Sequence, residues 1–100
     1  MNANQMRQLQ KLQQEMAKAQ EEIQNATTEG TAAGGVVTVT MSGDFRITKV
    51  TLSPDVVDPQ DVETLEDLVV VACADAHKKM QDFAAKRMGA VTGGMRIPGL

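Results

Sequence analysis

The chain has 100 residues, a net charge of −3 and one cysteine, Cys73. This length suits one domain with a thin core. A single cysteine excludes an intrachain disulfide framework. The negative net charge gives no overall attraction to nucleic acid or to an anionic membrane. The polar, glutamine-rich start lacks a signal-peptide pattern, and the longest apolar run, Leu68 to Ala74, is too short to span a bilayer. We therefore expect a cytoplasmic protein without membrane contact.

The first expected element is an amphipathic helix over residues 4–25. Apolar residues recur with heptad spacing in two rows: Leu9, Met16 and Ile23, and three positions later Leu12, Ala19 and Ala26. Two such rows are typical of a helix that packs against another helix. The helix would be about 33 Å long, which exceeds what one thin domain can cover. Part of the apolar row is therefore expected to contact another chain.

Residues 27–52 predict three antiparallel strands. The central strand is the clearest, because Val37, Val39 and Met41 alternate with Thr38 and Thr40, the period-two pattern of a half-buried strand. Residues 27–33 can form a preceding strand that turns at the glycine pair 34–35.

A hairpin is expected to join the second and third strands. Gly43-Asp44 predicts a two-residue turn, and the following strand, residues 45–52, is expected to point Val50 and Leu52 inward. Phe45 and Ile47 fall in the opposite phase. This change of phase predicts either a bulge or a strand with contacts on both faces.

The second helix is expected to begin at Pro59 with Asp58 as its cap, and to end at Gly89. Its predicted core stripe is Val62, Leu65, Val69, Ala72, Ala76, Met80 and Phe83. Residues 68–74 are apolar on all sides, which indicates burial against the sheet on one side and a partner helix on the other. A buried strand is the alternative for this stretch, because valines have little helix preference.

These elements predict an α+β fold in the order α-β-β-β-α, with a single domain over residues 1–88 and a flexible tail over residues 89–100. Phe45 and Phe83 are the only aromatic residues, so a core of aliphatic side chains would gain from a second copy. An intertwined homodimer is expected, with its interface formed by Leu9, Leu12, Met16, Leu68, Val69 and Ala72.

No motif predicts catalysis, a metal or a cofactor. Cys73 and His77 are spaced to share a helix face and could form a nucleophile pair or half a metal site. A structural explanation fits them better: Cys73 is a small residue of the core, and His77 marks the point where the helix reaches solvent. The acidic residues between Asp55 and Asp67 lack the spacing of a calcium loop and suit the start of a helix. We therefore expect neither an enzyme nor a small-molecule substrate.

Basic residues form two groups. Arg7, Lys11 and Lys18 fall within about 40° of one another on the first helix, nearly opposite Leu9 and Met16. A second group, near the end of the second helix, consists of Lys78, Lys79, Lys86 and Arg87. Both groups are either ordinary solvated helix faces or phosphate contacts. With so few aromatic side chains, base stacking is not expected, so the nucleic-acid hypothesis is phosphate-dominated binding of double-stranded DNA.

The chain resembles the YbaB/EbfC family of bacterial nucleoid-associated proteins. The resemblance lies in MRQLQKLQQEM at residues 6–16, in residues 34–80, above all LEDLVVVACADAHKK at residues 65–79, and in the ending RIPGL. It implies a tweezer-like homodimer whose protruding helices bind double-stranded DNA and help to organise the nucleoid, without a cofactor or a reaction. DNA contact would then fall on the two basic groups.

A different class of function fits the same helices. The exposed apolar row and the methionines are also features of adaptable protein-binding surfaces. The alternative is therefore a protein–protein adaptor dimer with little DNA affinity.

Overall fold

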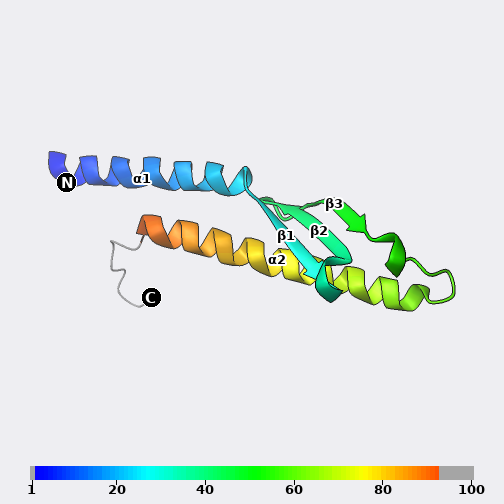
Figure 1. Ribbon diagram of the computed structural model, residues 1–100. Coiled ribbons are helices and arrows are strands. Elements are labelled where there is room, and N and C mark those ends of the chain that lie inside the picture. Colours follow the sequence, from blue (N-terminus) through cyan, green and yellow to red (C-terminus); the bar gives the residue numbers. More distant parts are fainter. Residues whose placement is uncertain (1, 93–100) are drawn as a thin grey trace.

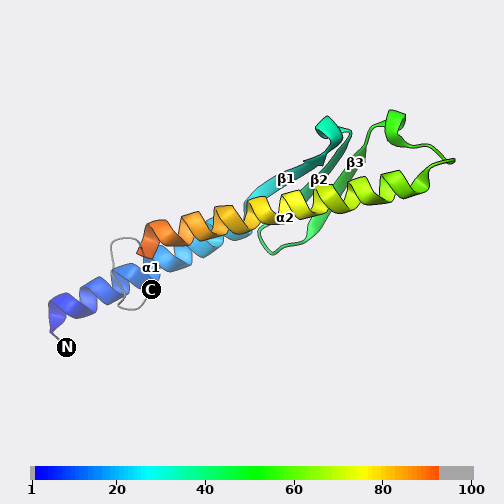
Figure 2. The ribbon, with the colours of Figure 1, turned by 90° about the horizontal axis from the view of Figure 1, so that it is seen from below.

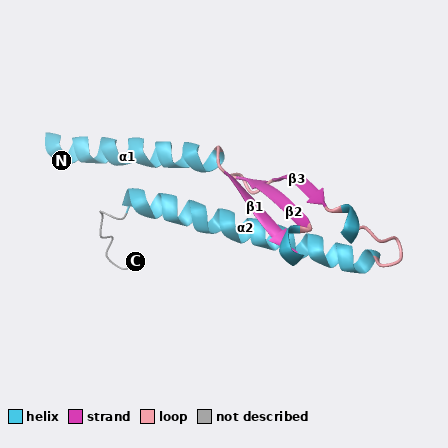
Figure 3. Cartoon of the chain, in the orientation of Figure 1, coloured by secondary structure: helices cyan, strands magenta, loops and turns pink. Residues whose placement is uncertain are grey.

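The computed structural model describes residues 2–92 and confirms the α-β-β-β-α order (Figures 1 and 3). Its helices and strands are α1 (Ala3–Gln24), β1 (Thr27–Ala32), β2 (Val37–Ser42), β3 (Ile47–Leu52) and α2 (Val62–Thr92), with short 3-10 turns at Ala33–Gly35 and Pro54–Val56. The strands form one antiparallel sheet in the order β1-β2-β3. The chain is elongated, with extents of 70 × 26 × 16 Å. Neither described helix has the length and apolarity that crossing a membrane requires.

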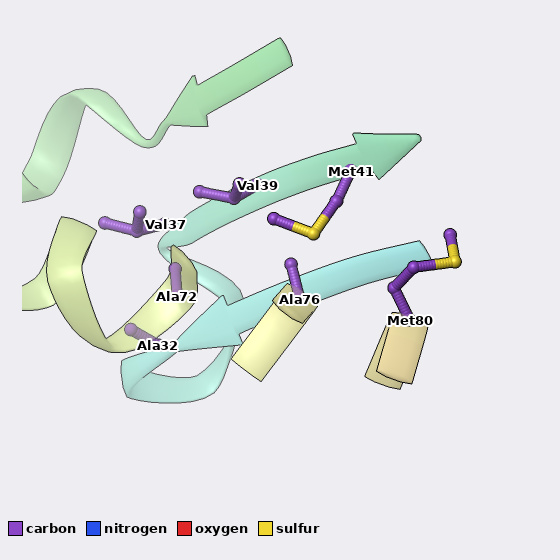
Figure 4. Packing of buried hydrophobic residues seen from close by; sticks show 7 residues of the cluster. All are labelled: Ala32, Val37, Val39, Met41, Ala72, Ala76 and Met80. Atoms are coloured by element: carbon purple, nitrogen blue, oxygen red, sulfur yellow. The ribbon is translucent and has the colours of Figure 1, made fainter. Parts of the chain in front are cut away.

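The core lies where α2 crosses β1 and β2 (Figure 4). It contains Ala32, Val37, Val39, Met41, Ala72, Ala76 and Met80. β1 approaches α2 closely because Gly30 lacks a side chain: a Cβ there would lie 2.1 Å from the Ala72 carbonyl oxygen. The predicted stripe on α2 is thus buried at Ala72, Ala76 and Met80, half-buried at Leu65 and Val69, and exposed at Val62 and Phe83.

The β2–β3 hairpin differs from the predicted two-residue turn. Its loop has three residues, Gly43 to Phe45, because the Phe45 amide donates to the Ser42 carbonyl (2.9 Å) and the Ser42 amide donates to the Arg46 carbonyl (2.9 Å). Phe45 takes the left-handed conformation (φ 62°) that such a loop requires at its third position. The two-residue prediction was wrong because it assigned Phe45 to the strand.

Of the two predicted alternatives for β3, the bulge is present. Thr40 pairs with Lys49 and Met41 pairs with Ile47, so Thr48 is the additional residue. The bulge puts Ile47 on the same face as Val50 and Leu52, which pair with the buried Val39 and Val37. These three β3 side chains share the core face of the sheet, as predicted for Val50 and Leu52. They nevertheless stay exposed, because α2 covers β1 and β2 and leaves β3 open.

Both predicted ends of the second helix were wrong. Asp58 caps only a short turn, and Asp61 caps the helix instead, since its carboxylate accepts from the Thr64 amide (3.3 Å) and hydroxyl (2.7 Å). At the other end, α2 continues through Gly89 to Thr92. Packing outweighs the weak helix preference of glycine, because Val91 is half-buried beside α1. The remaining predicted tail, residues 93–100, lies outside the described residues. The strand alternative for residues 68–74 was also wrong.

Candidate nucleic-acid interface

Two helical segments extend beyond the sheet and run antiparallel, side by side (Figures 1 and 2). We call α1 and residues 80–92 of α2 the arms. The residues buried or half-buried along their contact are Leu12, Met16, Ala19 and Ile23 of α1 and Ala84, Met88 and Val91 of α2. From Leu12 onward, the heptad rows of α1 therefore pack on α2 of the same chain. Leu9, one turn earlier, remains 44% exposed.

One ion pair joins the arms. The Arg87 guanidinium donates from Nε to a carboxylate oxygen of Glu22, and only 31% of the Arg87 side chain is exposed. The hydrogen bond from Arg87 lowers the pKa of Glu22, and the same bond raises the pKa of Arg87. Arg87, which the sequence assigned to DNA contact, therefore bonds within the chain. Its partner lies 65 residues away.

Lys79 is also engaged, at the free edge of β1. Its ammonium donates to the Glu29 carbonyl (3.0 Å) and pairs with Asp75 (3.0 Å). The Asp75 carboxylate accepts the Thr31 amide (2.9 Å), and this bond, followed by that from Lys79, lowers the pKa of Asp75. The two α2 side chains thus satisfy backbone groups that an edge strand leaves open. Sequence reasoning missed Asp75, because its partner Thr31 is 44 residues away.

The remaining five predicted bases are exposed: Arg7, Lys11 and Lys18 on α1 and Lys78 and Lys86 on α2. None of the five forms an ion pair with another residue of the described part of the chain. Helical geometry sets the α1 bases along one strip, roughly 130° around the axis from the side that packs on α2. The arms thus leave a basic strip open to solvent.

Negative charge is concentrated at the opposite end of the molecule. Residues 54–67 contain six acidic residues and no basic one, and they occupy the end farthest from the N-terminus of α1 (Figure 1). The molecule is therefore electrically polarised along its long axis. A polyanion that approaches the arm end meets the least repulsion.

Cys73 and His77 have different surroundings in the structure. His77 packs against Phe45, with ring centroids 5.0 Å apart, and Cys73 is half-buried beside the core. Within residues 2–92, no group of three His, Cys, Asp or Glu side chains is placed to hold a metal ion.

An apolar surface, which we call the β3 ledge, lies where α2 leaves the sheet open. It consists of Phe45, Ile47, Val50, Leu52 and Val70, with exposures between 37% and 67%. Val70 joins the strand residues because it lies on the same side of α2 as His77, which contacts Phe45. Sequence reasoning missed the ledge as a surface, since its strand residues were expected to be covered.

The residues predicted for a dimer interface fall into two separate groups. Leu9 is exposed, and Leu12 and Met16 are half-buried beside α2. Leu68 and Val69 are half-buried against the core, and Ala72 is fully buried beneath β1. Residue 68 lies about 28 Å along α2 from Arg87. The structure does not bring the two groups together within one chain.

Comparisons with known proteins converge on one family. A sequence model described as the YbaB/EbfC DNA-binding family matches residues 1–95. A relative from Roseiflexus sp. (strain RS-1), named a nucleoid-associated protein, is 53% identical over 100 residues, which is 99% of both chains. One from Desulforamulus reducens, with the same name, is 53% identical and covers 95% of this chain and 90% of its own. The crystal structure of an uncharacterized Helicobacter pylori protein shares the fold, with a TM-score of 0.68 at 16% identity, over 96% of this chain and 99% of that one.

Proposed function

The chain belongs to the YbaB/EbfC DNA-binding family, and we propose that it is a nucleoid-associated protein that binds double-stranded DNA through the phosphate backbone. The observation that carries this proposal is the strip of exposed bases Arg7, Lys11 and Lys18 at the end of the molecule opposite the acidic residues. Relatives with closely similar sequences carry the name nucleoid-associated protein. The proposed location is accordingly the nucleoid.

The spacing of the strip suits a phosphate backbone. Arg7 and Lys18 are eleven residues apart, which corresponds to about 16 Å along a helix. One strand of B-DNA presents a phosphate about every 3.4 Å along the axis, so each base of the strip can meet a different phosphate. Side chains of this type position a protein on DNA without reading its sequence. We therefore propose binding that is weakly selective and strongly dependent on salt.

We propose that the binding form is a homodimer that associates through the β3 ledge. Contiguous apolar surface is rare on monomeric proteins, and all five residues of the ledge are apolar and between 37% and 67% exposed. A second copy supplies a matching surface about a twofold axis. Because the ledge lies away from the arms, dimerisation leaves the α1 strip of each protomer free and doubles the number of its bases.

The decisive experiment is a gel shift at low salt with random-sequence duplex DNA. The variant Arg7→Glu/Lys11→Glu/Lys18→Glu reverses the strip without touching the face that packs on α2. The matched control, Arg46→Glu/Lys49→Glu, reverses two exposed bases on the β2–β3 hairpin. We expect the strip variant to lose most of its affinity and the control to retain it. Equal loss in both variants contradicts a localised DNA surface.

The same experiment separates DNA binding from the adaptor alternative. An adaptor dimer would give no shift at any salt concentration, yet it would still dimerise through the ledge. We propose no catalytic reaction, because the proposed role requires only binding.

A further inference from the structure

The apolar face of α1 continues beyond the end of α2. Leu12 is the last α1 residue that is half-buried along the contact with α2. Residues 2–11 are all exposed. Met6 and Leu9 are 51% and 44% exposed there, and Leu9 occupies the same heptad row as Met16, which α2 does cover. A short apolar surface thus remains in line with the axis of α2.

The chain has a segment of suitable length and composition at this point. Eight residues follow Thr92 with the sequence GGMRIPGL, which contains three large apolar residues, Met95, Ile97 and Leu100. Its first two glycines accept almost any backbone conformation, which allows a change of direction directly after the helix. The segment contains no acidic residue, so it shows no charge complementarity to the basic strip of α1. Its apolar side chains are the groups that the exposed face of α1 can bury.

We propose that residues 93–100 pack along the uncovered face of α1, with Met95 and Ile97 against Leu9 and Met6. The reach is sufficient, because eight extended residues span up to about 26 Å and Met6 lies about 9 Å beyond Leu12, the last α1 residue that packs on α2. A covalently attached segment also has a high effective concentration at the end of its own helix. In the proposed dimer the second copy associates through the β3 ledge, on the other half of the molecule.

This packing orders the part of α1 that carries Arg7 and Lys11. Helical ends without tertiary contacts open locally at low cost, and an isolated helix of this length is marginal in water. Contact with residues 93–100 would hold the strip in helical geometry. The packing does not depend on DNA binding, so the test below uses the free protein.

The first test is amide hydrogen exchange on the free full-length chain. The variant Met95→Ser/Ile97→Ser/Leu100→Ser keeps the length and removes the apolar contacts. We expect amides of residues 6–12 to exchange at least about threefold faster in this variant. Amides of residues 19–24, which pack on α2, serve as the internal control and are expected to stay unchanged. Identical exchange over residues 6–12 overturns the proposal.

The second test uses disulfide trapping in a Cys73→Ala background. The pair Leu9→Cys/Ile97→Cys probes the proposed contact, and Arg7→Cys/Ile97→Cys is the matched control, because Arg7 points to nearly the opposite side of α1. We expect the Leu9 pair to form an intrachain disulfide several times faster than the Arg7 pair, seen on a non-reducing denaturing gel. Equal rates overturn the proposal. Crosslinks formed only between two chains also overturn it, since they would assign the α1 face to a partner.

Discussion

The salt dependence of DNA binding follows from which bases the structure leaves free. Five of the seven bases predicted to contact DNA are unpaired within the described residues of each protomer, so the proposed dimer presents about ten of them. Each neutralised phosphate contributes about −0.9 to the slope of log K against log salt. If all ten bases contact phosphates, the slope is about −9, and the affinity falls by about 10⁵ between 50 and 200 mM salt.

Neutralising the α1 strip tests this count directly. The variant Arg7→Gln/Lys11→Gln/Lys18→Gln removes about six of the ten contacts from a dimer, so its slope should be less steep by about 5. Its affinity should then fall by only about 100-fold over the same salt range. Fluorescence anisotropy with a labelled duplex at five or more salt concentrations measures both slopes.

The two engaged bases supply the control. Lys79→Gln and Arg87→Gln remove charges that bond to Glu29, Asp75 and Glu22 within the chain. We expect each to change the slope by less than about one contact per protomer. An unchanged slope for the α1 variant, or an equal change for the engaged pair, would refute the assignment of the strip as the phosphate contact.

Three further predictions concern stability and assembly. Gly30→Ala would place a Cβ 2.1 Å from the Ala72 carbonyl oxygen. The resulting overpacking should lower the free energy of unfolding, measured by urea denaturation, by about 3 kcal/mol. The control Gly89→Ala has free space around its Cβ and should leave the free energy of unfolding unchanged or raise it. Asp75 has a lowered pKa in the folded chain, so its contribution to stability is present above its unfolded pKa of about 3.9 and is lost as the pH falls below that value. Asp75→Asn should therefore melt at a lower temperature than wild type at pH 6, with a smaller difference at pH 2; a constant difference would contradict this explanation. Val50→Asp puts a charge on the β3 ledge and should convert the dimer to a monomer in analytical ultracentrifugation, while Thr51→Asp, on the opposite face of the strand, should leave it dimeric.

Local patterns were sufficient for the order and type of the elements. Heptad and period-two spacing depend only on neighbouring residues, so α1, β2 and α2 could be predicted. The change of phase between Ile47 and Val50 gave the β3 bulge as one of two alternatives. The helix ends were less predictable. Asp58-Pro59 is a typical helix start, but these residues form a separate turn before the helix. Gly89 is a typical helix end, but packing on α1 extends the helix beyond it.

The candidate site also has one part that local sequence patterns predict and one part that depends on tertiary contacts. The sequence by itself determined that the bases of α1 share a strip, since helical geometry alone places Arg7, Lys11 and Lys18 together. Only the tertiary structure decided which bases are free, because the carbonyl of Glu29 that Lys79 bonds and the carboxylate of Glu22 that Arg87 bonds lie 50 and 65 residues away. It also decided that the apolar face of β3 stays open, since that depends on where α2 crosses the sheet. Burial and the ion pair between Arg87 and Glu22 arise from contacts between distant segments, which no local pattern records.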